Sequence, residues 1–107
     1  MKVVFHPEFP NDQRKFRADY AGISEGLAVR FQQEIDEAIE AIKAAPSGAG
    51  HFVNVVSTVV PEFRRRNLRA FPFFVLYGWA NDTLIFGSIV PTRSDPLNWL
   101  TRFHEQS

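Results

Sequence analysis

The apolar residues in the first half of the chain follow a helical period. Between His6 and Tyr20, Phe16 lies four residues before Tyr20, which is the spacing of one face of a helix. Two prolines, Pro7 and Pro10, confine the regular part of this helix to the residues beyond them, and Gly22 ends it.

A longer and better-defined helix is predicted from about Ser24 to Ala44. Ser24 is a suitable N-cap, and Pro46 prevents continuation of the helix. One apolar stripe runs along it, formed by Leu27, Phe31, Ile35, Ala38, Ile39 and Ile42. The acidic residues lie mostly away from that stripe and are expected to face water: Glu34, Asp36, Glu37 and Glu40. The two helices therefore predict a helical hairpin.

The remaining pattern is mainly that of strands. Val3–Phe5 is a short strand, and the valine-rich residues 49–62 fit either a strand or a long packed loop. From Phe63 onward the pattern is β. The segments 73–80 and 83–90 flank Asn81-Asp82, a pair that tolerates the positive φ of a tight hairpin turn.

The strand 73–80 is apolar on both faces. Alternation places Phe73, Val75, Tyr77 and Trp79 on one face and Phe74 and Leu76 on the other. A strand with one solvated face should alternate apolar and polar residues. Either both faces are covered, or one face is a site for another chain.

Asp95-Pro96 resembles an N-cap followed by a first-turn proline, and Leu97, Leu100 and Phe103 recur at helical spacing. A short helix is therefore predicted at the end of the chain. The fold class is α+β: a small antiparallel β-sheet with the N-terminal helical hairpin packed on it, in the order β-α-α-β-β-β-α. Residues 1–107 make a single domain, because the chain leaves little room for a second core.

The composition argues against a membrane-spanning protein and excludes a disulfide-bonded one. The chain is 45% apolar or aromatic, has no cysteine, and has no apolar run long enough to span a membrane. A cytoplasmic protein without membrane attachment is expected. The three histidines have no metal-ligand spacing and there is no glycine-rich phosphate loop, so neither a metal nor a cofactor is predicted.

Charge is distributed unevenly although the net charge is zero. Residues 1–62 carry six Lys/Arg against nine Asp/Glu, and residues 63–107 carry six Arg against three acids. Within the second part, the run 64–69 fits an edge strand whose charges block aggregation, or a surface for an acidic partner or phosphates. Alternation along a strand groups Arg65 and Asn67 with Arg69, and Arg64 and Arg66 with Leu68.

The order of short motifs resembles the RelE/ParE superfamily of toxins from type II toxin–antitoxin modules, and its ParE-like branch in particular. The resemblance covers nearly the whole chain. It rests on Val4-Phe5-His6-Pro7-Glu8, Asp12, Tyr20, Gly26-Leu27-Ala28, Phe31, Ala38, Ile39, Ile42, Pro46, Arg64-Arg65, Leu68-Arg69, Phe71-Pro72-Phe73, Tyr77, Arg93, Asp95-Pro96 and Trp99.

The two branches of this superfamily differ in chemistry. RelE-like members cleave mRNA in the ribosome with a cluster of basic residues, which here would be Arg65, Arg69, Arg93 and Trp99. Phe73 or its neighbour stands where another Arg is expected, the lysines of the catalytic loop are missing, and the indole of Trp99 cannot act as an ordinary acid or base. No catalytic site is therefore assigned, and an enzyme is the less favoured interpretation.

ParE-like members lack that cluster and poison DNA gyrase through protein–protein contact. The resemblance implies such a toxin of a plasmid-stabilisation module, which arrests growth and is neutralised by a cognate antitoxin protein. Direct specific DNA binding is not expected. Pro91 and Ser94 depart from the ParE-like pattern, so the alternatives are a RelE-like ribosome-dependent endoribonuclease or a non-toxic relic that still binds an antitoxin.

The candidate partner-binding residues are Arg64, Arg65, Arg69, Arg93 and Trp99, together with the apolar strand faces. Arg93 is the strongest of them, because burying its charge without a partner would cost several kcal/mol. Trp99 and Tyr77 are each interpreted first as packing residues.

Overall fold

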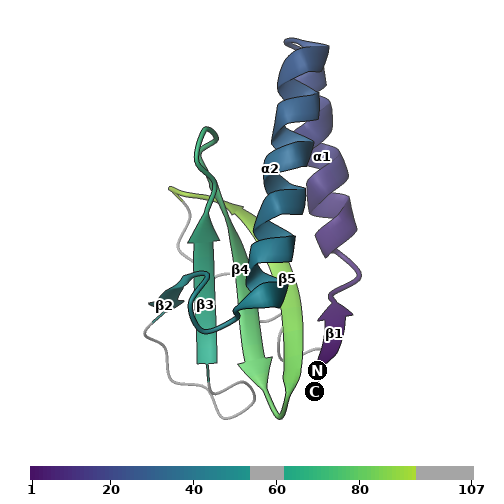
Figure 1. Ribbon diagram of the computed structural model, residues 1–107. Coiled ribbons are helices and arrows are strands. Elements are labelled where there is room, and N and C mark those ends of the chain that lie inside the picture. Colours follow the sequence, from purple (N-terminus) through teal and green to yellow (C-terminus); the bar gives the residue numbers. More distant parts are fainter. Residues whose placement is uncertain (54–61, 94–107) are drawn as a thin grey trace.

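A computed structural model describes residues 1–53 and 62–93, apart from the side chains of residues 51–53, 62 and 80. In these ranges the chain forms two helices and five strands (Figure 1). The elements are β1 (Lys2–Phe5), α1 (Phe9–Ala21), α2 (Glu25–Ala44), β2 (His51–Val53), β3 (Glu62–Asn67), β4 (Phe73–Ala80) and β5 (Thr83–Pro91). The predicted terminal helix and residues 54–61 lie outside the described residues.

The two helices form the predicted hairpin, and α1 begins earlier than the sequence suggested. It starts at Phe9 and holds Pro10 in its first turn, where the missing N–H of a proline costs no helical hydrogen bond. Ser24 caps α2 as expected, since its Oγ accepts from the Leu27 N–H at 3.4 Å. Both helices stand side by side, and their joined ends project beyond the sheet (Figure 1).

The five strands form one sheet in the order β1-β5-β4-β3-β2. The neighbours from β2 to β5 are antiparallel as predicted, but β1 pairs parallel with β5, so the sheet is mixed where the sequence predicted an antiparallel one. The direction of β1 relative to β5 depends on the path of the chain through the helical hairpin and the other strands. The sequence of β1 alone carries no information about that path. The short β2 lies within residues 49–62, for which the sequence allowed either a strand or a loop.

The β4–β5 hairpin forms as predicted. Ala80 pairs with Thr83, and the two residues between them, Asn81 and Asp82, have φ angles of 50° and 59°. These positive angles belong to a two-residue turn whose twist matches the strands. A register shift in the pairing lies between Leu76 and Tyr77.

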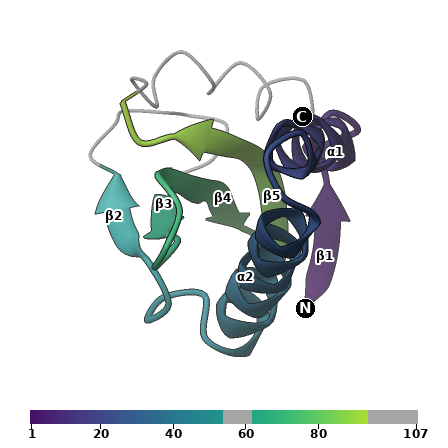
Figure 2. The same cartoon turned by 90° about the horizontal axis from the view of Figure 1, so that it is seen from above.

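The main core lies between the helical hairpin, formed by α1 and α2, and one face of the sheet (Figure 2). Its centre is a group of aromatic rings in which Phe31 of α2 packs edge-on against Phe71 and Phe73, with centroid distances of 5.4 and 5.5 Å. Tyr20 of α1 contacts the same rings. The predicted stripe of α2 faces this core, because Phe31, Ile35 and Ile42 are fully buried.

The other face of the central strands is buried as well. Phe74, Leu76 and Val90 have no solvent-exposed surface, and Ile85 is 8% exposed. Of the two alternatives for an all-apolar strand, full coverage is therefore the correct one. Because these side chains are buried, the expectation that the apolar strand faces contact a partner is not supported for them.

Candidate partner-binding surface

The arginines of β3 alternate between the two faces of the sheet, as the sequence predicted. Arg64 and Arg66 lie on the side of the helices and hold the loop between α2 and β2. Arg64 Nη1 donates to the Gly50 carbonyl at 3.0 Å, and Arg66 Nη1 donates to the Ala49 carbonyl. Arg64 is therefore engaged with the chain's own backbone, although it was proposed for partner contact.

Tyr77 completes this attachment of the loop. Its hydroxyl donates to the Pro46 carbonyl at 2.8 Å, so three side chains from the sheet hold three carbonyls of one loop. The loop lies so close that a Cβ on Gly50 would stand 2.7 Å from both the Arg65 carbonyl oxygen and the Tyr77 hydroxyl. The sequence interpretation treated Tyr77 as packing only and gave Gly50 no role.

Arg65 lies on the opposite face of β3. Its guanidinium carbon is 4.2 Å from the centre of the Phe74 ring, a cation–π distance, and its Nη2 donates to Asn67 Oδ1 at 3.1 Å. These contacts orient the guanidinium toward the end of β3. The side chain remains partly exposed and keeps its charge available to a ligand.

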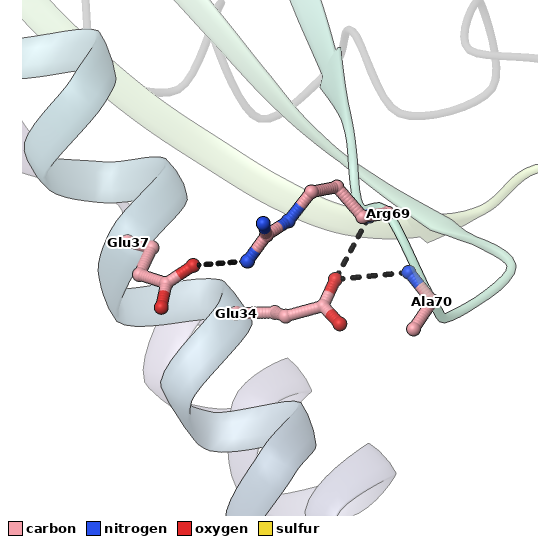
Figure 3. Close-up of polar contacts among 4 residues, drawn as sticks. All are labelled: Glu34, Glu37, Arg69 and Ala70. Atoms are coloured by element: carbon pink, nitrogen blue, oxygen red, sulfur yellow. Dashed lines mark hydrogen bonds and ion pairs between the residues drawn. The ribbon is translucent and has the colours of Figure 1, made fainter.

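Arg69 does not share a face with Arg65, contrary to the alternation predicted from the sequence. The strand ends at Asn67, and the Leu68 N–H bonds back to the Phe73 carbonyl, so a turn redirects the next residues. Arg69 Nη2 reaches Glu37 Oε2 on α2 at 2.7 Å (Figure 3). Arg65 and Arg69 therefore point to opposite sides of the sheet.

Two of the acidic residues expected to face water, Glu34 and Glu37, instead bond to the β3–β4 turn. Glu34 Oε1 accepts from the backbone N–H groups of Arg69 and Ala70, at 2.8 and 3.1 Å, and Glu37 pairs with the Arg69 side chain (Figure 3). Their i, i+3 spacing on α2 could have indicated that they share a face, but not that the β3–β4 turn lies beside it.

Arg93 lies just beyond β5 and is exposed. The preceding Thr92 bonds to the Pro72 carbonyl through its N–H at 3.0 Å and its hydroxyl at 3.3 Å, so this segment lies beside the β3–β4 turn. We call the region formed by residues 67–72 and 91–93 the turn end of the sheet. Arg69 and Arg93 are exposed there, and Arg65 is oriented toward it. Trp99 lies outside the described residues.

The charged side chains at the turn end of the sheet are arginines, which suit the binding of anions and not the transfer of protons. Guanidinium groups bind carboxylates and phosphates but do not lose a proton near neutral pH. Within residues 1–53 and 62–93, no group of three His, Asp or Glu side chains is placed to hold a metal ion. The helices of the same part of the chain include none that is long and apolar enough to cross a membrane.

Comparison with known proteins gives a match at the level of structure. No family model matches the sequence, and no curated protein is similar to it. The fold is similar to that of a chain from the chromosomal ParDE TA system of P. aeruginosa, with a TM-score of 0.67 and 20% sequence identity. The match covers 85% of this chain and 95% of that chain. The expected fold is thereby confirmed.

Proposed function

We propose that this chain is the toxin of a type II toxin–antitoxin module, that it acts in the cytoplasm by binding DNA gyrase, and that a cognate antitoxin neutralises it. The observation that carries the proposal is the similarity in fold to a chain of a ParDE system, over 85% of this chain and 95% of that chain. The motifs that resemble ParE-like toxins, spread from Val4 to Trp99, support the same assignment.

The geometry of the arginines favours binding over RNA cleavage. A phosphorane-stabilising cluster requires several cations aimed at one phosphate. Arg65 stacks on Phe74 on one side of the sheet, whereas Arg69 meets Glu37 on the other. An endoribonuclease that uses both side chains on one phosphate would need a different arrangement of the turn.

The partner-binding surface of this proposal is the turn end of the sheet. Arg93 is exposed and has no described bond to the chain, and Arg69 is exposed although paired. An acidic segment of an antitoxin would complement these charges, and the same surface would be covered when the toxin is neutralised.

Controlled expression tests the proposal. The toxin assignment predicts growth arrest with filamentation, and the gyrase assignment predicts that purified protein inhibits supercoiling. Arg93→Ala should weaken both effects, whereas Arg30→Ala, which removes an exposed charge from α2, should leave them unchanged. Normal growth together with unaffected supercoiling would reject the toxin, and arrest with intact gyrase but cleaved mRNA would select the endoribonuclease instead.

A further inference from the structure

The turn between β3 and β4 binds a carboxylate of its own chain. The backbone N–H groups of Arg69 and Ala70 both donate to one oxygen of Glu34, at 2.8 and 3.1 Å (Figure 3). Consecutive N–H groups that converge on one atom form a concave site for an anion. The observed occupant shows that a carboxylate fits this site.

The surroundings of the site supply further charge and space. Arg69 Nη2 lies 2.7 Å from Glu37 Oε2, and this pair is open to water, because the two side chains are 79% and 62% exposed. A shallow groove, open to solvent, separates α2 from the end of β3, with Glu34 and Glu37 on one wall and Arg66 and Arg69 on the other. A second carboxylate can therefore approach the turn from solvent.

We propose that the β3–β4 turn is a carboxylate-binding site that Glu34 fills in the free protein and gives up to an acidic side chain of a partner protein. The incoming carboxylate would remake the two backbone hydrogen bonds that Glu34 leaves, so the exchange conserves the number of charge-assisted bonds. Glu34 is only half-buried and can be rehydrated as it leaves. That the partner is an antitoxin or a target rests on the proposed function; the carboxylate site does not.

The exchange makes a quantitative prediction about affinity. A ligand that needs a site occupied by an internal group binds more weakly in proportion to the fraction of molecules in which the site is open. Removing the internal carboxylate should therefore tighten binding. Asp36→Ala is the matched control, since it removes the same charge from the same helix while its only described bond is to Gln32.

A titration of the 107-residue chain with a blocked triglutamate peptide tests the site, with backbone amide NMR signals as the readout and triglutamine as the control ligand. Glu34→Ala should bind triglutamate at least about tenfold more tightly than the wild type and Asp36→Ala, with the Arg69 and Ala70 amides shifting most. Equal affinities for Glu34→Ala and Asp36→Ala, or unmoved Arg69 and Ala70 amides, would overturn the proposal.

A second variant covers the case in which Glu34→Ala fails to fold. Glu34→Gln keeps the shape of the side chain and loses its charge. Its affinity for triglutamate should therefore exceed that of the wild type. Where Glu34→Ala is folded, the affinity of Glu34→Gln should also lie below that of Glu34→Ala. An affinity equal to that of the wild type would contradict the exchange. The titration involves neither gyrase nor growth, so it can fail while the toxin assignment holds, and the reverse is equally true.

Discussion

The carboxylate of Asp12 in α1 accepts a hydrogen bond from the Ile89 N–H of β5 at 3.1 Å, across 77 positions of sequence. β1 pairs with β5 only as far as Phe86, so Ile89 lies beyond the end of that pairing. Asp12 therefore accepts the hydrogen bond of the Ile89 N–H, for which the short β1 provides no backbone carbonyl. Both residues are buried, and the contact fixes α1 to the sheet.

Replacement of Asp12 tests this contact. Asp12→Ala should lower the free energy of unfolding by about 1–3 kcal/mol, because it leaves a buried N–H without an acceptor. Asp12→Asn should cost less, since its amide oxygen can still accept the bond. Urea unfolding of the three proteins gives the comparison, and equal losses for the two variants would show that the hydrogen bond contributes nothing measurable.

Gly50 should not tolerate a side chain. A Cβ at this position meets the Arg65 carbonyl oxygen at 2.7 Å, and the backbone of a paired strand cannot easily move away. Gly50→Ala should lower the free energy of unfolding by about 1–3 kcal/mol. Gly26→Ala is the control: its Cβ would lie 3.5 Å from Ser24 Oγ, and alanine favours the helix by up to about 1 kcal/mol. Similar stability of the two variants in thermal unfolding would contradict the close docking of the loop.

Ser88 is predicted to be a site where a substitution stabilises the protein. Its hydroxyl is fully buried, and the described residues offer it no hydrogen-bond partner. Ser88→Ala should raise the free energy of unfolding by about 1 kcal/mol, because the unfolded chain solvates a hydroxyl that the folded chain leaves unsatisfied. A marked loss of stability in urea unfolding would mean that the hydroxyl has a partner.

The stability of the protein should depend on Tyr20 at high pH. Burial, and then the nearby Asp19 carboxylate, raise the pKa of the Tyr20 phenol above its ordinary value of 10.0. The fold therefore favours the neutral phenol, and this contribution is fully present below pH 10 and is lost as the pH rises through the folded-state pKa. The wild type should lose stability relative to Tyr20→Phe as the pH rises above 10. An unchanged difference in unfolding free energy across that range would contradict the shift.

The local elements could be predicted from the sequence, because their causes are local. The spacing of Phe31 and Ile35, the Ser24 cap and the Asn81-Asp82 turn each act within a few residues, and all three are confirmed. The parallel pairing of β1 could not be predicted, since it depends on segments about 80 residues apart.

The candidate site was predictable only in part, for the same physical reason. Alternation separated Arg64 and Arg66 from Arg65 correctly because β3 is regular there. It failed at Arg69, where the strand ends and a turn brings the side chain to Glu37 of α2. Contacts between a turn and a distant helix leave no periodic signal in the sequence.

The most direct test of the account is the affinity of the purified chain for its cognate antitoxin, measured by calorimetry. We expect tight binding that weakens at least about tenfold when Arg65, Arg69 and Arg93 are all replaced by Gln. Replacement of Arg14, Lys15 and Arg30, which are exposed on the helices and carry the same total charge, should leave the affinity unchanged. Equal weakening by the two triple variants, or no binding by the wild type, would contradict a partner-binding surface at the turn end of the sheet.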